Sequence, residues 1–167
     1  MQEKTFKKLS QKMQNKQRHY IDTSILVEIL AKQKLAESCK NHIYSFKSGN
    51  KLCFTSSVCI GESISALTRF EEDYKEINQE FSVTDAFAYL SELIIQIPIH
   101  IVPITQETFN IIKEYQNNET GRLDSMDILN FASAKEWEAE IFITKDNDFK
   151  NKINLLKQGI KIFLISK

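Results

Sequence analysis

The stretch RHYIDTS (residues 18–24) indicates the fold class of this chain. Residues 18–21 are typical of a short strand, and they run directly into an aspartate, Asp22. The next two residues, Thr23 and Ser24, are both able to cap a helix that begins at Ile25. The stretch therefore predicts a strand, an acid at its exit, and a helix that follows at once.

The same order of strand and helix continues along the chain. Further strands are predicted at 51–55, 99–104, 140–144 and 160–165, and helices at 25–47 with a break, 57–72, 106–115 and 124–138. Residues 73–97 are helical by pattern until Pro98, and 117–121 form a loop. Strands that are nearly continuous in Ile, Val and Phe and that alternate with helices indicate a parallel sheet covered on both faces, so the fold class is α/β.

Length and composition favour one globular domain. The chain has 167 residues, of which 42% are hydrophobic and 26% charged. No apolar run is long enough for a membrane span, and no secretory signal is expected. The three cysteines form no CxxC or Cys/His pattern, which argues against a disulfide framework or a zinc site and favours the cytoplasm.

The charge of the chain is balanced overall but uneven. Six of its 22 basic residues and one of its 22 acidic residues lie in the first 18 positions, which leaves 16 basic and 21 acidic residues in positions 19–167. We therefore divide the chain into a basic extension, 1–17, as a short amphipathic helix or a tail, and a domain, 18–167. The net charge alone does not indicate a nucleic-acid-binding protein.

Carboxylates stand where a parallel sheet usually holds its functional site. Such sites lie beyond the carboxyl ends of the strands, where Asp22 and Asp146 leave two predicted strands. Glu62 lies about two turns into the helix after the second strand, and Asp127 lies at the start of another helix. Carboxylates that converge in this way repel one another unless a cation neutralises them or some are protonated. Mg²⁺ or Mn²⁺ suits such oxygen ligands.

Each acid also has a purely structural interpretation. Asp124 is three residues before Asp127, so the two could form a capping pair, and for Asp124 capping is the favoured role. Asp148 could equally be a solvated loop residue. Glu62 differs because it lies among apolar neighbours, where a buried acid needs a partner or a metal.

Four stretches together resemble the conserved blocks of the PIN-domain family. They are YIDTS (20–24), SSVCIGE (56–62), DILNFASA (127–134) and ITKDNDF (143–149), and they stand in the order of the family's blocks. The resemblance covers about residues 18–165. The Lys-rich start and residues 70–98 depart from the family's pattern.

The resemblance implies a three-layer α/β/α sandwich around a parallel sheet of four to five strands. It also implies a ribonuclease that binds Mg²⁺ or Mn²⁺ through Asp22, Glu62 and Asp127, with Asp146 completing the set and with Asp148 and Asp124 as secondary candidates. Thr23 and Thr144 would orient the acids through hydrogen bonds. Many family members of this size resemble the toxins of bacterial toxin–antitoxin pairs, so the implied partners are an RNA substrate and a small antitoxin protein, with a homodimer as a further option.

The mechanism expected from these residues is in-line attack of a metal-activated water on an RNA phosphodiester. Arg69, Lys145 and the N-terminal lysines are the expected contacts to the RNA backbone. One alternative is a phosphatase or phospho-acceptor domain with Asp22 as covalent nucleophile, although the usual DxD is missing. A second alternative is a non-catalytic module that binds RNA or assembles with a partner.

Overall fold

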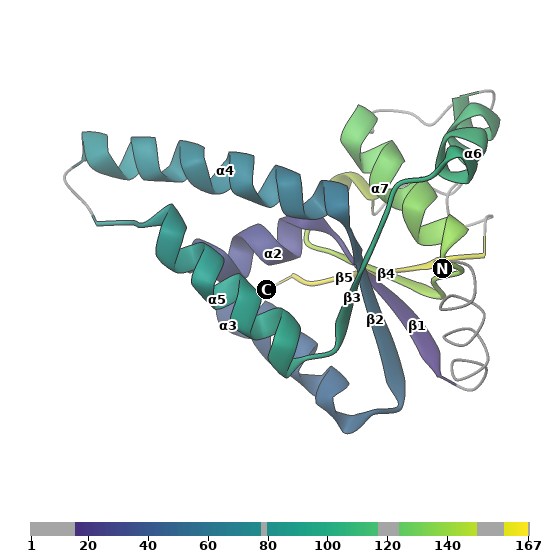
Figure 1. The fold of residues 1–167 in the computed structure, drawn as a ribbon, viewed down its shortest axis with the longest axis horizontal. Coiled ribbons are helices and arrows are strands. Elements are labelled where there is room, and N and C mark those ends of the chain that lie inside the picture. Colours follow the sequence, from purple (N-terminus) through teal and green to yellow (C-terminus); the bar gives the residue numbers. More distant parts are fainter. Residues whose placement is uncertain (1–15, 78–79, 117–123, 150–158, 167) are drawn as a thin grey trace, which may run out of the picture.

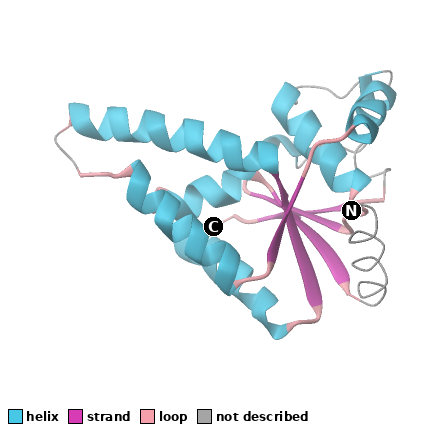
Figure 2. Ribbon diagram, viewed as in Figure 1, coloured by secondary structure: helices cyan, strands magenta, loops and turns pink. Residues whose placement is uncertain are grey.

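A parallel sheet of five strands lies between two layers of helices in the computed structural model (Figures 1 and 2). The structure describes residues 16–77, 80–116, 124–149 and 159–166. Most of the basic extension and the predicted loop at 117–121 therefore lie outside the described residues. The predicted class, a three-layer α/β/α sandwich, is confirmed.

The sheet is built around the first strand. Its members are β1 (Gln17–Ile21), β2 (Lys51–Ser56), β3 (Ile99–Val102), β4 (Ile141–Thr144) and β5 (Lys161–Leu164). Their order is β3-β2-β1-β4-β5, and all neighbouring strands are parallel. β3 ends two residues earlier than predicted, because Pro103 follows and has no N–H to donate to a strand ladder.

Two groups of helices cover the two faces. On one side lie α2 (Thr23–Leu30), α3 (Ala36–Tyr44), α4 (Ser57–Glu76) and α5 (Val83–Gln96), and on the other lie α6 (Gln106–Gln116) and α7 (Ser125–Glu136) (Figure 1). Short 3-10 turns, η1 (Ser45–Ser48) and η2 (Asn147–Phe149), complete the described elements. None of these helices combines the length and the apolar character that crossing a membrane requires.

The predicted helical stretch 73–97 is two helices. α4 runs four residues beyond its predicted end, and α5 begins after Ser82, whose hydroxyl accepts the N–H of Asp85 at 3.2 Å. α4 and α5 contact each other and extend together away from the sheet (Figure 1). The cap at Ser82 explains why a second helix starts here without a preceding glycine or proline.

The topology creates a switch point between β1 and β4. The helices that follow β1 and β2 lie on one face, whereas α6 and α7, which lead from β3 to β4, lie on the other. β1 and β4 are neighbours, so their carboxyl ends lie side by side where the strand order reverses. In open α/β sheets this is the usual place for a binding crevice.

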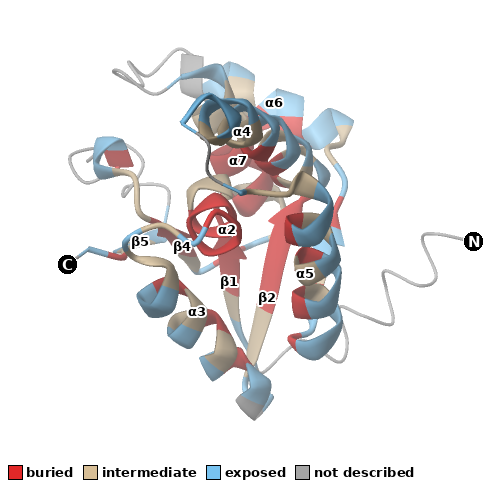
Figure 3. Cartoon of the chain, turned by 90° about the vertical axis from the view of Figure 1, so that its left-hand side faces the viewer, coloured by how far each residue is buried: buried red, intermediate tan, exposed pale blue. Residues whose placement is uncertain are grey.

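The ends of the central strands are rigidly packed. The carboxyl-terminal halves of β1 and β2 are buried, as is almost all of α2 (Figure 3). Tyr20 stacks on Phe142 with ring centroids 5.5 Å apart, and Phe142 lies 4.9 Å from Phe149. This aromatic packing fixes the backbone from which Asp22 and Asp146 project.

Candidate carboxylate site

Asp22 leaves β1 as a buried side chain whose oxygen is held by two hydroxyls. Its exposure is 3%, and its Oδ2 accepts hydrogen bonds from Ser24 Oγ at 2.6 Å and Thr144 Oγ1 at 2.8 Å. Burial raises the pKa of this carboxyl, although both hydroxyls act in the opposite direction. The site therefore keeps a carboxyl out of water with neutral donors alone.

The start of α2 differs from the prediction. Thr23 and Ser24 were expected as helix caps, but both lie inside α2 and Asp22 occupies the cap position. The Asp22 side chain makes no capping hydrogen bond, because the hydroxyls of Ser24 and Thr144 engage it. Thr23 instead donates its hydroxyl to Glu62.

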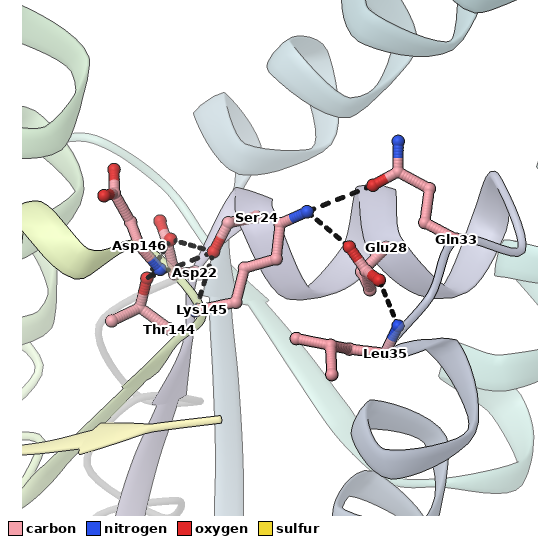
Figure 4. A network of polar contacts seen from close by, with 8 residues as sticks. All are labelled: Asp22, Ser24, Glu28, Gln33, Leu35, Thr144, Lys145 and Asp146. Carbon is pink, nitrogen blue, oxygen red and sulfur yellow. Dashed lines mark hydrogen bonds and ion pairs between the residues drawn. The ribbon is translucent and has the colours of Figure 1, made fainter. Parts of the chain in front are cut away.

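Asp146 stands beside Asp22 at the exit of β4 (Figure 4). Its backbone N–H donates to Thr144 Oγ1 at 3.0 Å, and its Oδ1 accepts the N–H of Asp148 at 2.8 Å. Thr144 thus links the backbone of one acid to the side chain of the other. Asp148 is exposed and contributes its backbone to this turn, which agrees with the interpretation of a loop residue.

Glu62 reaches the same region from α4. Its Oε2 accepts hydrogen bonds from Thr23 Oγ1 at 2.6 Å and from Asn130 Nδ2 at 2.8 Å. The carboxylate is half-buried, and it is held by one side chain from α2 and one from α7. Three helices therefore meet at this acid.

Asp127 lies in the first turn of α7, and the charges of the other acids affect its pKa. Its pKa is raised from 3.8 to about 7, first by burial and then by the charges of Asp124, Asp22 and Asp146. Asp124 also caps α7, since its Oδ1 accepts the N–H groups of Met126 at 2.8 Å and Asp127 at 2.9 Å. The predicted capping role of Asp124 is thus seen directly.

The donor chemistry of this cluster fits a hard divalent cation. Its side chains are carboxylates, and a bound cation would relieve the repulsion that raises the pKa of Asp127. Within the described ranges, however, no three His, Cys, Asp or Glu side chains form a group that could hold a metal ion as they stand. The side chains therefore match a divalent cation in residue type and charge, but their present arrangement does not form a complete metal site among the described residues.

Two side chains that the sequence analysis did not identify take part in the site. Ser24 holds Asp22, and Asn130 holds Glu62. Asn130 could have been noticed as a polar residue in an apolar helix stretch, three positions after Asp127 and so on the same helix face. Ser24 was harder to identify as a partner of Asp22 from the sequence, because a hydroxyl after a strand also suits a helix cap.

Lys145 makes its contacts within the protein, and its contact with an RNA backbone stays a prediction. Its Nζ forms an ion pair with the buried Glu28 and donates to Gln33 Oε1 at 3.0 Å (Figure 4). Of the other predicted contacts, Arg69 is exposed on α4, and the lysines at positions 4–12 lie outside the described residues.

The family model described as "PIN domain" matches residues 19–154. The VapBC2 structure from Rickettsia felis, bound to a promoter DNA fragment, matches with a TM-score of 0.66 and 14% identity over 88% of this chain and 98% of that chain. The sarcin-ricin loop cleaving toxin VapC20 of Mycobacterium tuberculosis matches with a TM-score of 0.58 and 17% identity over 79% and 92% of the two chains.

A third solved structure, DNA-bound VapBC from Salmonella typhimurium, has a TM-score of 0.61 and 12% identity over 88% of this chain and 97% of that chain. No curated protein matches the chain. At these low identities the structural matches show a shared fold.

Proposed function

Because this chain belongs to the PIN domain family, we propose that it is a divalent-metal-dependent endoribonuclease whose active site is formed by Asp22, Glu62, Asp127 and Asp146. The observation that carries the proposal is that Asp22 and Asp146 leave the neighbouring strands β1 and β4 and are joined through the Thr144 hydroxyl, which donates to Asp22 and accepts the N–H of Asp146. Their charges, after burial and the charge of Asp124, also raise the pKa of Asp127. Asp22, Asp127 and Asp146 lie far apart in the sequence, yet they interact electrostatically at the switch point of the sheet. Unneutralised carboxylates of this kind suit a cation site.

The chain's own residues would prepare the site in two ways. Ser24 and Thr144 fix the Asp22 carboxylate through hydroxyl donors that carry no charge, so its negative charge stays available to a cation. Burial and the neighbouring acids raise the pKa of Asp127, and cation binding would favour its ionised form. Mg²⁺ or Mn²⁺ bound there would activate water and stabilise the negative charge that develops on the phosphate.

The proposed substrate and partner follow from the solved relatives. VapC20 is described as a toxin that cleaves the sarcin-ricin loop, and other matches are VapBC assemblies. We propose on this basis that the chain cuts RNA as the toxin of a toxin–antitoxin pair and that a small antitoxin protein binds it. A homodimer is a further proposed assembly.

The environment of Asp22 argues against the phospho-acceptor alternative. A covalent nucleophile has to approach phosphorus, but Asp22 is only 3% exposed and one of its oxygens is engaged by two hydroxyls. In hydrolysis by an activated water, the Asp22 carboxylate does not have to reach phosphorus, because its role is to bind the cation.

The decisive experiment is an RNA cleavage assay with a fluorogenic RNA in Mg²⁺, in Mn²⁺ and in EDTA. We expect cleavage by the wild type with either cation, none in EDTA, and none by Asp22→Asn. Asp73→Asn is the matched control, since it removes the same charge from an exposed residue of α4 that is not a candidate ligand. Absence of divalent-dependent cleavage by the wild type would favour a non-catalytic RNA-binding or assembly module.

A further inference from the structure

Asn130 is a buried amide at the centre of a chain of polar contacts. The residue lies in α7, is 1% exposed, and follows the apolar Ile128 and Leu129. Its Nδ2 lies 2.8 Å from Glu62 Oε2 and 3.3 Å from Thr23 Oγ1. A polar group in such surroundings destabilises the fold unless it is hydrogen-bonded, so its partners decide what it does.

The other end of the amide is fixed by two donors. Ser56 Oγ donates to Asn130 Oδ1 at 3.3 Å, and Cys59 Sγ donates to the same oxygen at 3.2 Å. Ser56 Oγ also accepts the N–H of Cys59 as the cap of α4, which leaves its hydrogen for Asn130. Reversing the amide would set its NH₂ against these two donors. The NH₂ is therefore directed toward Glu62.

The position of Asn130 connects two candidate acids. It lies three residues after Asp127, so both side chains project from one face of α7. Glu62 belongs to α4, in the opposite helix layer, and Asn130 joins it to α7. The hydrogen bond thus ties Glu62, which Thr23 also holds, to the helix that carries Asp127.

We propose that Asn130 is a positioning residue that holds the Glu62 carboxylate for a divalent cation; this inference rests on the proposed nuclease function. The neutral NH₂ of Asn130 gives Glu62 a hydrogen bond in place of those that water would give it. It does not neutralise the charge of the Glu62 carboxylate. A lysine or arginine here would satisfy the same oxygen and compete with the cation. An amide is the side chain that orients the acid and leaves its charge for the metal.

The test measures Mn²⁺ affinity by calorimetry in four proteins: wild type, Asn130→Leu, Ser63→Ala and Glu62→Gln. Asn130→Leu keeps the branched shape and the number of heavy atoms but removes the NH₂ donor together with the carbonyl acceptor, and we expect affinity to fall 10–100-fold, as is typical when a group that orients a metal ligand is lost. Ser63→Ala is the control, because Ser63 is buried next to Glu62 in α4 and donates to Cys59 O rather than to the acid. We expect its affinity to stay within twofold of the wild type.

A double variant separates positioning from general loosening of the fold. Adding Asn130→Leu to Glu62→Gln should cause no further loss of affinity, because the carboxylate that Asn130 orients is already gone. A further tenfold loss in the double variant would mean that Asn130 acts on the fold rather than on Glu62.

NMR provides a readout that needs no change at Asn130. In metal-free protein the side-chain NH₂ signals of Asn130 should shift on Glu62→Gln, and Mg²⁺ should shift them in the wild type but not in Glu62→Gln. The role of Asn130 is refuted, and the nuclease proposal is not, if the wild type binds Mn²⁺, Asn130→Leu binds it equally well, and the NH₂ signals do not shift. If the wild type binds no divalent cation, the nuclease proposal fails and the inference fails with it.

Discussion

Lys145 forms an ion pair with the buried Glu28, and this pair ties the exit of β4 to α2 (Figure 4). The Glu28 side chain is 3% exposed and that of Lys145 is 30% exposed. The other Glu28 oxygen accepts the N–H of Leu35 at 2.5 Å. The residue that precedes Asp146 is thus anchored to the helix that follows Asp22.

The unequal burial of this pair predicts unequal effects of its two partners. Lys145→Met leaves a buried carboxylate unpaired and should lower the free energy of unfolding by about 3 kcal/mol or more. Glu28→Gln leaves a partly exposed ammonium that water can solvate and an oxygen that still accepts from Leu35, so about 1–2 kcal/mol is expected. Urea unfolding of both variants measures the two values. Equal losses would show that the pair behaves as an exposed one.

Replacing Asp22 by Asn should separate activity from stability. Cleavage should fall by more than about 100-fold, since the loss exceeds that typical of residues that only orient a ligand. The metal-free fold should be as stable as the wild type or more so, because the pKa of Asp22 is raised by burial and an amide removes a buried charge. Chemical unfolding in EDTA, beside the cleavage assay, checks both. A clearly less stable variant that still cuts RNA contradicts the proposed role.

Ser24→Ala should destabilise the metal-free protein by about 1–3 kcal/mol at pH 8, since a buried carboxylate loses a hydroxyl donor. The loss should shrink at lower pH, where Asp22 takes up a proton. Ser57→Ala serves as the control, because Ser57 is exposed at the start of α4. Unfolding curves at two pH values measure this difference. A loss of stability that does not depend on pH would show that Ser24 does not act through the Asp22 carboxylate.

Asp127 predicts a pH dependence with a definite sign. Its folded pKa of about 7 exceeds the ordinary 3.8, so the folded state holds the proton more tightly than the unfolded state. The ionised carboxylate therefore destabilises the fold above about pH 7, and this effect is lost as the pH falls toward 4. Asp127→Asn should gain about 1–2 kcal/mol over the wild type at pH 8, a figure reduced for solvent screening, and little at pH 4.

Comparing Asp127→Asn with the wild type removes the contribution of the histidines. The pKa values of His19, His42 and His100 are lowered chiefly by burial, so their protonation destabilises the fold on acidification in both proteins. The measurement is the difference between urea unfolding free energies in EDTA across pH 4–8. A difference that stays constant across that range would be inconsistent with the raised pKa of Asp127.

The sequence predicted the framework of the fold because its signals are local. Continuous apolar strands such as 141–144, each followed by a polar residue or a cap, are properties of a few neighbouring positions. The exits of β1 and β4, with Asp22 and Asp146, follow from the general rule for parallel sheets. The four acids as metal ligands remain a prediction.

The resemblance named Thr23 and Thr144 as residues that orient the acids, but which acid each partner holds could not be predicted, because the partners are distant in sequence. Asn130 and Glu62 are 68 positions apart, and Lys145 and Glu28 are 117 apart. Which hydroxyl or amide meets which acid depends on how α4 and α7 pack on the sheet. Lys145 is an example, since a lysine beside an acidic site suggests a phosphate contact and the sequence gives no sign of its ion pair with the buried Glu28.

The strand order also governs when the site can exist during synthesis. The central strand β1 is synthesised before β4, with which it pairs, so this pairing cannot form until residue 144 has been translated. Asp22 and Glu62 leave the ribosome well before Asp127 and Asp146. If the chain is the ribonuclease proposed above, its acid set is therefore incomplete until Asp146 has left the ribosome.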